Sequence, residues 1–137
     1  MDIPAIATVE ISSEDPQFPI DNVFQNEEGP GWRAGGAGKQ TLRLSFETAR
    51  TIRHIRLEFR ETERERTQEF TLRWWAKGDS MPREIIRQQW NFSPRGSTRE
   101  VEDYGVNLDH VSALELQINP EIGGGDVRAS LQRWQIA

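Results

Sequence analysis

Apolar and polar residues alternate one by one along most of the chain, which is the pattern of half-buried β-strands. In residues 41–46, Leu42, Leu44 and Phe46 fall on one face of a strand and polar residues fall on the other. The same alternation predicts seven further strands, at residues 6–11, 54–60, 69–76, 85–92, 100–108, 113–118 and 129–136. No long segment has the helical period, and residues 19–25 predict a single helical turn.

Short polar segments rich in glycine, proline or charge separate these strands, and they predict turns and loops. The four clearest are residues 47–50, 61–67, 76–82 and 119–126. Eight short strands without intervening helices indicate an all-β fold, an antiparallel eight-stranded jelly-roll β-sandwich. The length of 137 residues fits one domain, and we expect residues 1–137 to form it.

Successive antiparallel strands alternate in direction, so their connections fall at two opposite ends of the sandwich. The longest connections share one end: residues 25–39, 60–67, 93–100 and 119–128. Many arginines gather there: Arg33, Arg60, Arg64, Arg66, Arg95, Arg99 and Arg128. Ligand sites tend to lie in loops that a rigid scaffold carries, so we expect the binding site at this end.

Composition narrows the function classes. The net charge of −5 disfavours general attraction to nucleic acid, although 15 of the 17 basic residues are arginine, the residue suited to bidentate contacts. The chain has no cysteine, no apolar run of membrane-spanning length and no apparent signal peptide. A cytoplasmic location is the expectation. Neither histidine has acids spaced for a metal site, and no arrangement of residues suggests catalysis, so we expect no enzyme.

Residues 29–41 crowd glycines around Gly38 and Lys39, as phosphate-binding loops do. The Walker pattern fails, because Arg33 occupies the position of its first glycine and Gln40 that of its serine or threonine. We therefore interpret the stretch as scaffolding, in which the glycines let a long loop turn past a buried Trp32.

Several segments, taken in order, resemble the discoidin, or factor V/VIII C-type, domain of the galactose-binding-like superfamily. They are ISSEDPQFPIDNVFQ, GWRA, QTLRLSF, TIRHIRLEF, EFTLRWWA and ASLQRWQI. The opening third is also similar to the amino-terminal domain of the scaffold protein of single-strand-break repair. The resemblance implies a non-catalytic jelly roll that binds ligands with the loops at one end.

What the resemblance implies first is a lectin-like module for galactose-type sugars, with arginines on the loop at 60–67 and an aromatic ring for the apolar sugar face. The expected ligand-binding residues are Asn26, Glu28, Arg33, Arg60, Arg66 and Asn119. Charged neighbours offer a plainer interpretation of Arg60 and Arg66, as parts of a solvated charge run. Binding of one sugar would be weak, so an oligomer is possible.

The resemblance also implies a structural calcium ion in many sugar-binding members, held after the short helix and by a glutamate in the last strand. Aligning Asn22 with that motif places Gln25 and Asn26 at its Asp-Gly positions, and the last strand offers Gln132 and Arg133. Calcium prefers several carboxylate and carbonyl oxygens. We therefore expect no cofactor and no metal.

The alternative function comes from the resemblance to the repair scaffold, whose domain contacts a polymerase and broken DNA. It predicts a protein- or DNA-interaction domain. Its expected partner face consists of outward residues on the strands: Arg43, Arg56, Arg73 and Trp75.

Overall fold

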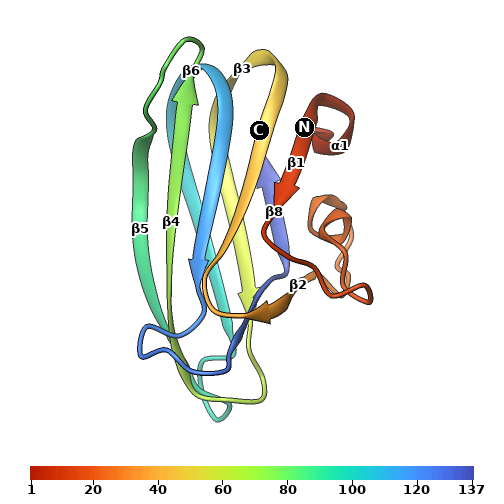
Figure 1. Cartoon of the computed structure of the whole chain (residues 1–137), viewed down its shortest axis with the longest axis vertical. Coiled ribbons are helices and arrows are strands. Elements are labelled where there is room, and N and C mark those ends of the chain that lie inside the picture. The colour runs from red at the N-terminus through yellow and green to blue at the C-terminus, as the bar shows by residue number, and fades with distance from the viewer.

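The computed structural model describes all residues, 1–137, and shows an antiparallel β-sandwich (Figure 1). Two short helices accompany the strands, α1 (Ile3–Ile6) and the 3-10 helix η1 (Ile20–Phe24). The strands are β1 (Ala7–Ile11), β2 (Trp32–Ala37), β3 (Gln40–Arg60), β4 (Arg66–Ala76), β5 (Arg83–Phe92), β6 (Arg99–Asn119), β7 (Arg128–Leu131) and β8 (Arg133–Ile136). No helix has the length and apolarity needed to cross a membrane.

Strands β3 and β6 are each 21 residues long and take part in both layers of the sandwich. The first half of β3 pairs with β1 and with the second half of β6. This half of β6 also pairs with β4, and β4 pairs with β5 at the edge of the layer. The second half of β3 pairs with the first half of β6 and with β8 in the opposite layer. Both strands bend over the top of the molecule in Figure 1. Strands β2 and β7 form a separate two-stranded sheet.

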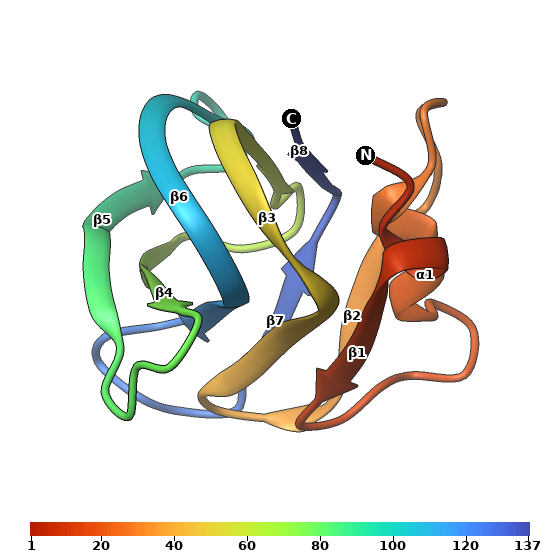
Figure 2. The same cartoon turned by 90° about the horizontal axis from the view of Figure 1, so that it is seen from above.

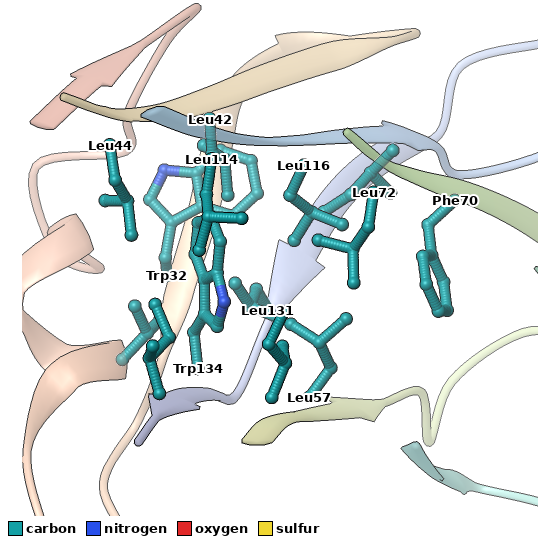
Figure 3. Packing of buried hydrophobic residues seen from close by; sticks show 14 of the residues in the cluster. Trp32, Leu42, Leu44, Leu57, Phe70, Leu72, Leu114, Leu116, Leu131 and Trp134 are labelled. Atoms are coloured by element: carbon teal, nitrogen blue, oxygen red, sulfur yellow. The ribbon is translucent and has the colours of Figure 1, made fainter. Parts of the chain in front are cut away.

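The core lies between the layers and contains 24 buried hydrophobic residues. In the first layer, Leu42, Leu116 and Leu72 stand side by side on three neighbouring strands. Leu57 and Trp134 pair in the second layer and point toward them, as Figure 3 shows. Burial of such alternating side chains is the main stabilising force of the sandwich.

The expected eight-stranded antiparallel sandwich is confirmed, but the strands divide differently. Residues 47–50, predicted as a turn, and residues 109–112, which separate two predicted strands, lie within the bends of continuous strands, where the register of β3 against β6 shifts. His110 adopts a positive φ of 55° at the bend of β6. Residues 32–37, predicted as loop, form β2, and the strand expected at 129–136 is interrupted at Gln132. The helical turn at 19–25 is confirmed as η1.

The long loops meet at one end, as predicted. The Glu61 N–H donates to the Thr98 carbonyl over 2.8 Å, and the Ile122 N–H donates to the Thr67 carbonyl over 2.9 Å. At the opposite end the Lys77 N–H donates to the His110 carbonyl over 2.7 Å. The loops form the lower end in Figure 1, and the bends form the upper end.

The two chain termini are neighbours. The Met1 ammonium donates to the Ile136 carbonyl over 2.9 Å, and Ala137 exchanges two backbone hydrogen bonds of 2.9 Å with His54. Figure 2 shows both ends on the same side of the molecule. His54 follows the bend of β3, so the termini lie away from the long loops.

Candidate functional site: an arginine-lined pocket at the loop end

An open pocket of about 510 Å³ lies at the loop end, where four segments distant in sequence converge. These are the chain at Phe18 before η1, the chain entering β2, the loop after β3 and the chain around β7. The arginines that line it are Arg33, Arg60, Arg64 and Arg128. The acids that line it are Glu61, Glu63 and Asp126. The predicted convergence of loops has therefore produced a concave, polar site.

Trp32 supports the pocket from below. Its side chain is 1% exposed, and its indole N–H donates to the Ser13 carbonyl over 3.2 Å. The preceding Gly31 has a φ of +74°, and a Cβ there would lie 2.6 Å from the Leu131 carbonyl oxygen. Only glycine fits this close approach. The interpretation of the stretch as scaffolding around a buried tryptophan is confirmed.

Three of the four arginines are held by neighbours. The Arg60 Nη2 lies 3.0 Å from Glu28 Oε1, Arg64 Nη1 donates to the Asp126 carbonyl over 3.2 Å, and Arg128 pairs with Asp15 at 3.9 Å. Arg33 differs, because its exposed guanidinium has no hydrogen bond or ion pair within the protein. Its main chain is fixed on both sides by bonds to Asp15 and to Phe18.

Arg66 does not face the pocket. Its side chain is 1% exposed, Nε lies 2.7 Å from Glu61 Oε1, and Nη1 donates to the Pro120 carbonyl over 2.8 Å. The guanidinium also lies 4.7 Å from the ring centre of Phe92. Arg66 is therefore a buried structural residue and not one of the ligand-facing residues expected from the sequence.

The other predicted ligand-binding residues are divided. Arg33 and Arg60 line the pocket, and Glu28 lies outside the lining as the ion-pair partner of Arg60. Asn119 instead lines a separate cavity of about 310 Å³ across the 119–128 loop. Asn26 contributes its backbone carbonyl to a contact with Arg133.

Two pocket residues, Arg64 and Arg128, are missing from the sequence-based list of ligand-binding residues. The alternation of strand direction already placed both at the loop end. The family resemblance pointed instead to Arg66, which the structure buries.

The four residues of the expected partner face do not share one face. Arg43 and Arg73 lie on the outer surface of the first layer, whereas Arg56 lies on that of the second. Arg43 stacks over Trp75 at 4.3 Å, and Arg73 donates to Gln117. Arg73 and Arg56 also lie beside acidic residues. The acidic partners are Glu115 for Arg73, and Glu58 and Asp103 for Arg56.

The segment that precedes β2 is tied to the rest of the chain by three side chains, which we call the loop clasp: Asn22, Gln132 and Arg133. Asn22 Nδ2 donates to the Gly31 carbonyl over 2.9 Å, Gln132 Nε2 to the Gly29 carbonyl and Arg133 Nη2 to the Asn26 carbonyl. A calcium ion needs oxygen ligands, but here the loop carbonyls already face N–H donors, one of them cationic. The residues present do not fit the calcium ion that the galactose-binding-like resemblance implies.

Replacing Arg133 with alanine is expected to destabilise the domain by about 1–2 kcal/mol, because a charge-assisted hydrogen bond to the loop is lost. Thermal unfolding should show a fall of the midpoint by several degrees. Calcium chloride or a chelator should leave the wild-type midpoint unchanged, and so should the exposed control substitution Arg87→Ala. A rise of the wild-type midpoint with calcium would contradict the assignment of the clasp.

A buried polar chain leads from the pocket into the sandwich. Glu61 Oε1 accepts from Arg66, which donates to Gln68 over 3.2 Å, and Gln68 Nε2 donates to Glu100 Oε1 over 3.2 Å. Glu100 is fully buried, and its Oε2 has no hydrogen-bond partner. Burial, aided by the neighbouring Glu102, raises the pKa of Glu100 to about 8. Glu100 is therefore largely protonated at neutral pH.

No protein-family model and no curated protein sequence matches the chain. Solved structures match it over nearly its whole length. A pectin-binding carbohydrate-binding module is 16% identical, with 96% of this chain and 89% of that chain covered and a TM-score of 0.67. The family 32 carbohydrate-binding module of C. perfringens NanJ, solved with galactose, is 14% identical, with 98% and 96% covered and a TM-score of 0.69.

XRCC1, solved bound to the catalytic domain of DNA polymerase β, is 14% identical, with 96% and 94% covered and a TM-score of 0.65. Identities this low show a shared architecture. The suspected resemblance is confirmed at this level, since both groups of proteins that the sequence resembles are found among the matches. The chain shares the β-sandwich fold of these carbohydrate-binding modules and of XRCC1.

Proposed function

We propose that this chain is a non-catalytic carbohydrate-binding module and that the arginine-lined pocket holds a galactose-type sugar. The observation that carries the proposal is the convergence of four guanidinium groups around one open pocket at the loop end. Sugar hydroxyls are good acceptors, and a guanidinium fork can donate to two neighbouring hydroxyls at once. The shared fold with a module solved with galactose supports the proposal.

Arg60 is the residue best prepared for this role. It extends from the end of β3, and its ion pair with Glu28 fixes one side of the guanidinium and leaves other N–H groups free. Ser130, in β7, adds a hydroxyl to the lining. Among the aromatic side chains in the lining, only Phe18 is partly exposed, so it is the one available to the apolar face of a sugar. An open pocket of this kind predicts weak binding of a single sugar.

Arg60→Ala is expected to weaken binding of methyl galactoside about tenfold, because it removes a charge-assisted donor pair without touching the core. The measurement is an NMR titration of the labelled domain, in which the perturbed amides should map to residues 30–33, 60–64 and 126–132. Arg87→Ala, an exposed arginine of β5, is the matched control and should leave the affinity unchanged. Absence of any perturbation by sugars, together with a blank glycan array, would overturn the proposed function.

The alternative is a domain that binds a protein or broken DNA. It is favoured by the stacking of Arg43 over Trp75 on the first layer and by the similarity to the polymerase-bound XRCC1 structure. On the same surface, Arg73 donates to Gln117 and lies beside Glu115, and the carboxylate of Glu115 offsets the positive charge of Arg73. Salt separates the two functions, since phosphate contacts weaken steeply with ionic strength and neutral hydrogen bonds do not.

A further inference from the structure

Arg33 is the one pocket arginine without a partner inside the protein. It follows the buried Trp32 on β2, and its backbone hydrogen bonds to Asp15 and Phe18, of 2.9 and 3.2 Å, hold the strand in place. The exposed guanidinium stands on this fixed base and lines the pocket. A cation held by a rigid main chain, with all its donors free, is prepared for a ligand group.

No acidic side chain of the pocket forms an ion pair with Arg33. Of the three acids in the lining, Glu61 is already used, with one oxygen on Arg66 and the other accepting from the Glu63 N–H over 3.1 Å. Glu63 and Asp126 remain against four arginines. Glu28 and Asp15 offset Arg60 and Arg128 from outside the lining. Glu63 and Asp126 equal Arg33 and Arg64 in number, but neither acid forms an ion pair, so the guanidinium of Arg33 stays free for a ligand.

The pocket is also poor in exposed apolar surface. Trp32 is buried, and three of the fourteen lining residues are hydrophobic. A neutral sugar exchanges hydrogen bonds to water for hydrogen bonds to the arginines, whereas a carboxylate adds a charge-assisted pair that matches the guanidinium fork. The free guanidinium of Arg33 therefore favours an anionic ligand over a neutral one of the same shape.

We propose that the sugar bound by this pocket carries a carboxylate, as in a uronic acid, and that Arg33 is the residue that recognises it. This inference rests on the proposed function and names the class of sugar within it. Arg60 and Arg128, held by Glu28 and Asp15, face the hydroxyls, and the unpartnered Arg33 donates two hydrogen bonds to the carboxylate.

The test compares two probes that differ at one carbon, methyl galacturonide with a carboxylate and methyl galactoside with a hydroxymethyl group. In NMR titrations at low salt, the galacturonide should bind about tenfold more tightly, and raising the salt concentration should reduce this advantage. Arg33→Gln removes the charge but keeps polar donors, and it should bring the ratio of the two affinities close to one. Arg87→Gln, which removes an equal charge from β5, should leave the ratio unchanged. A thermal melt of each variant confirms that it is folded.

The outcomes separate this inference from the proposed function. If neither sugar binds, both fail. If the two sugars bind equally well, carbohydrate binding stands and recognition of a carboxylate is overturned. If the galacturonide binds more tightly and Arg33→Gln keeps the full advantage, the assignment of the carboxylate to Arg33 is overturned.

Discussion

Replacing Arg66 with alanine is expected to lower the free energy of unfolding by about 3–5 kcal/mol, the cost of removing one partner from a buried ion pair. The substitution would leave Glu61 without the Nε contact at 2.7 Å and the Pro120 carbonyl without the donor at 2.8 Å. It would also empty the space over the Phe92 ring. Since small domains are stable by about 5–15 kcal/mol, this loss is a large fraction of the total stability.

Urea unfolding of the variant measures this loss. Arg95→Ala, at an exposed arginine of the loop at 93–98, is the matched control and should change the stability by less than about 0.5 kcal/mol. The double substitution Arg66→Met with Glu61→Gln should recover much of the loss, because it removes the uncompensated charge and refills the volume. A loss below about 1 kcal/mol for Arg66→Ala would contradict the buried ion pair. If Arg66→Ala loses stability as expected and also loses sugar binding, the loss of binding reports unfolding of the loop and not a missing ligand contact.

The stability of the wild-type domain is expected to fall as the pH rises from about 5 to 8, and Glu100→Gln should remove most of this fall. Folding raises the pKa of Glu100 from 4.5 to about 8, through burial first and the neighbouring Glu102 second. A group with a raised pKa in the folded state stabilises fully below its unfolded pKa and loses that contribution as the pH rises through the folded value. The whole change amounts to at most about 5 kcal/mol.

Urea unfolding at pH 5, 6, 7 and 8 tests this expectation. Glutamine keeps the size and the neutral state of the protonated carboxyl, so the variant should be more stable than wild type at pH 8. Glu63→Gln, at an exposed carboxylate, should retain the wild-type slope. Tyr104, whose pKa is raised above its ordinary value by burial and by Glu102, does not titrate in this range. A flat wild-type profile between pH 5 and 8 would mean that Glu100 is charged in the folded protein.

Alternation predicted the strands that are covered on one side, because burial of one face imposes a period of two. Leu42, Leu44 and Phe46 are buried, as predicted. The segment at 47–50 passes from one layer to the other around an edge, where neither face is covered, so it carries no such pattern. β2 escaped prediction for a related reason: apart from Trp32 and Arg33 it consists of alanine and glycine, and it is fixed by pairing with the distant β7.

The same logic explains what could be predicted of the site. The direction of the strands placed the arginines at one end. Whether a strand residue points inward or outward depends on its odd or even position along the strand, because side chains alternate between the two faces. Arg66 shares its parity with Phe70 and Leu72, whose side chains are buried, so the pattern of β4 already pointed it inward. Arg33 follows the buried Trp32 and therefore points outward. That Arg64 and Arg128 meet beside Arg33 depends on loop conformations that no local pattern encodes.

The neighbouring termini decide how the domain can be presented. Met1 and Ala137 both leave the fold beside the bend of β3, whereas the arginine-lined pocket opens among the loops at the other end. A tether on either terminus, whether a fused chain or a link to a surface, therefore departs on the side away from the pocket. Copies arrayed on one support in this way would direct their pockets outward, so that several could engage a single polysaccharide at once and together hold it more firmly than one copy can.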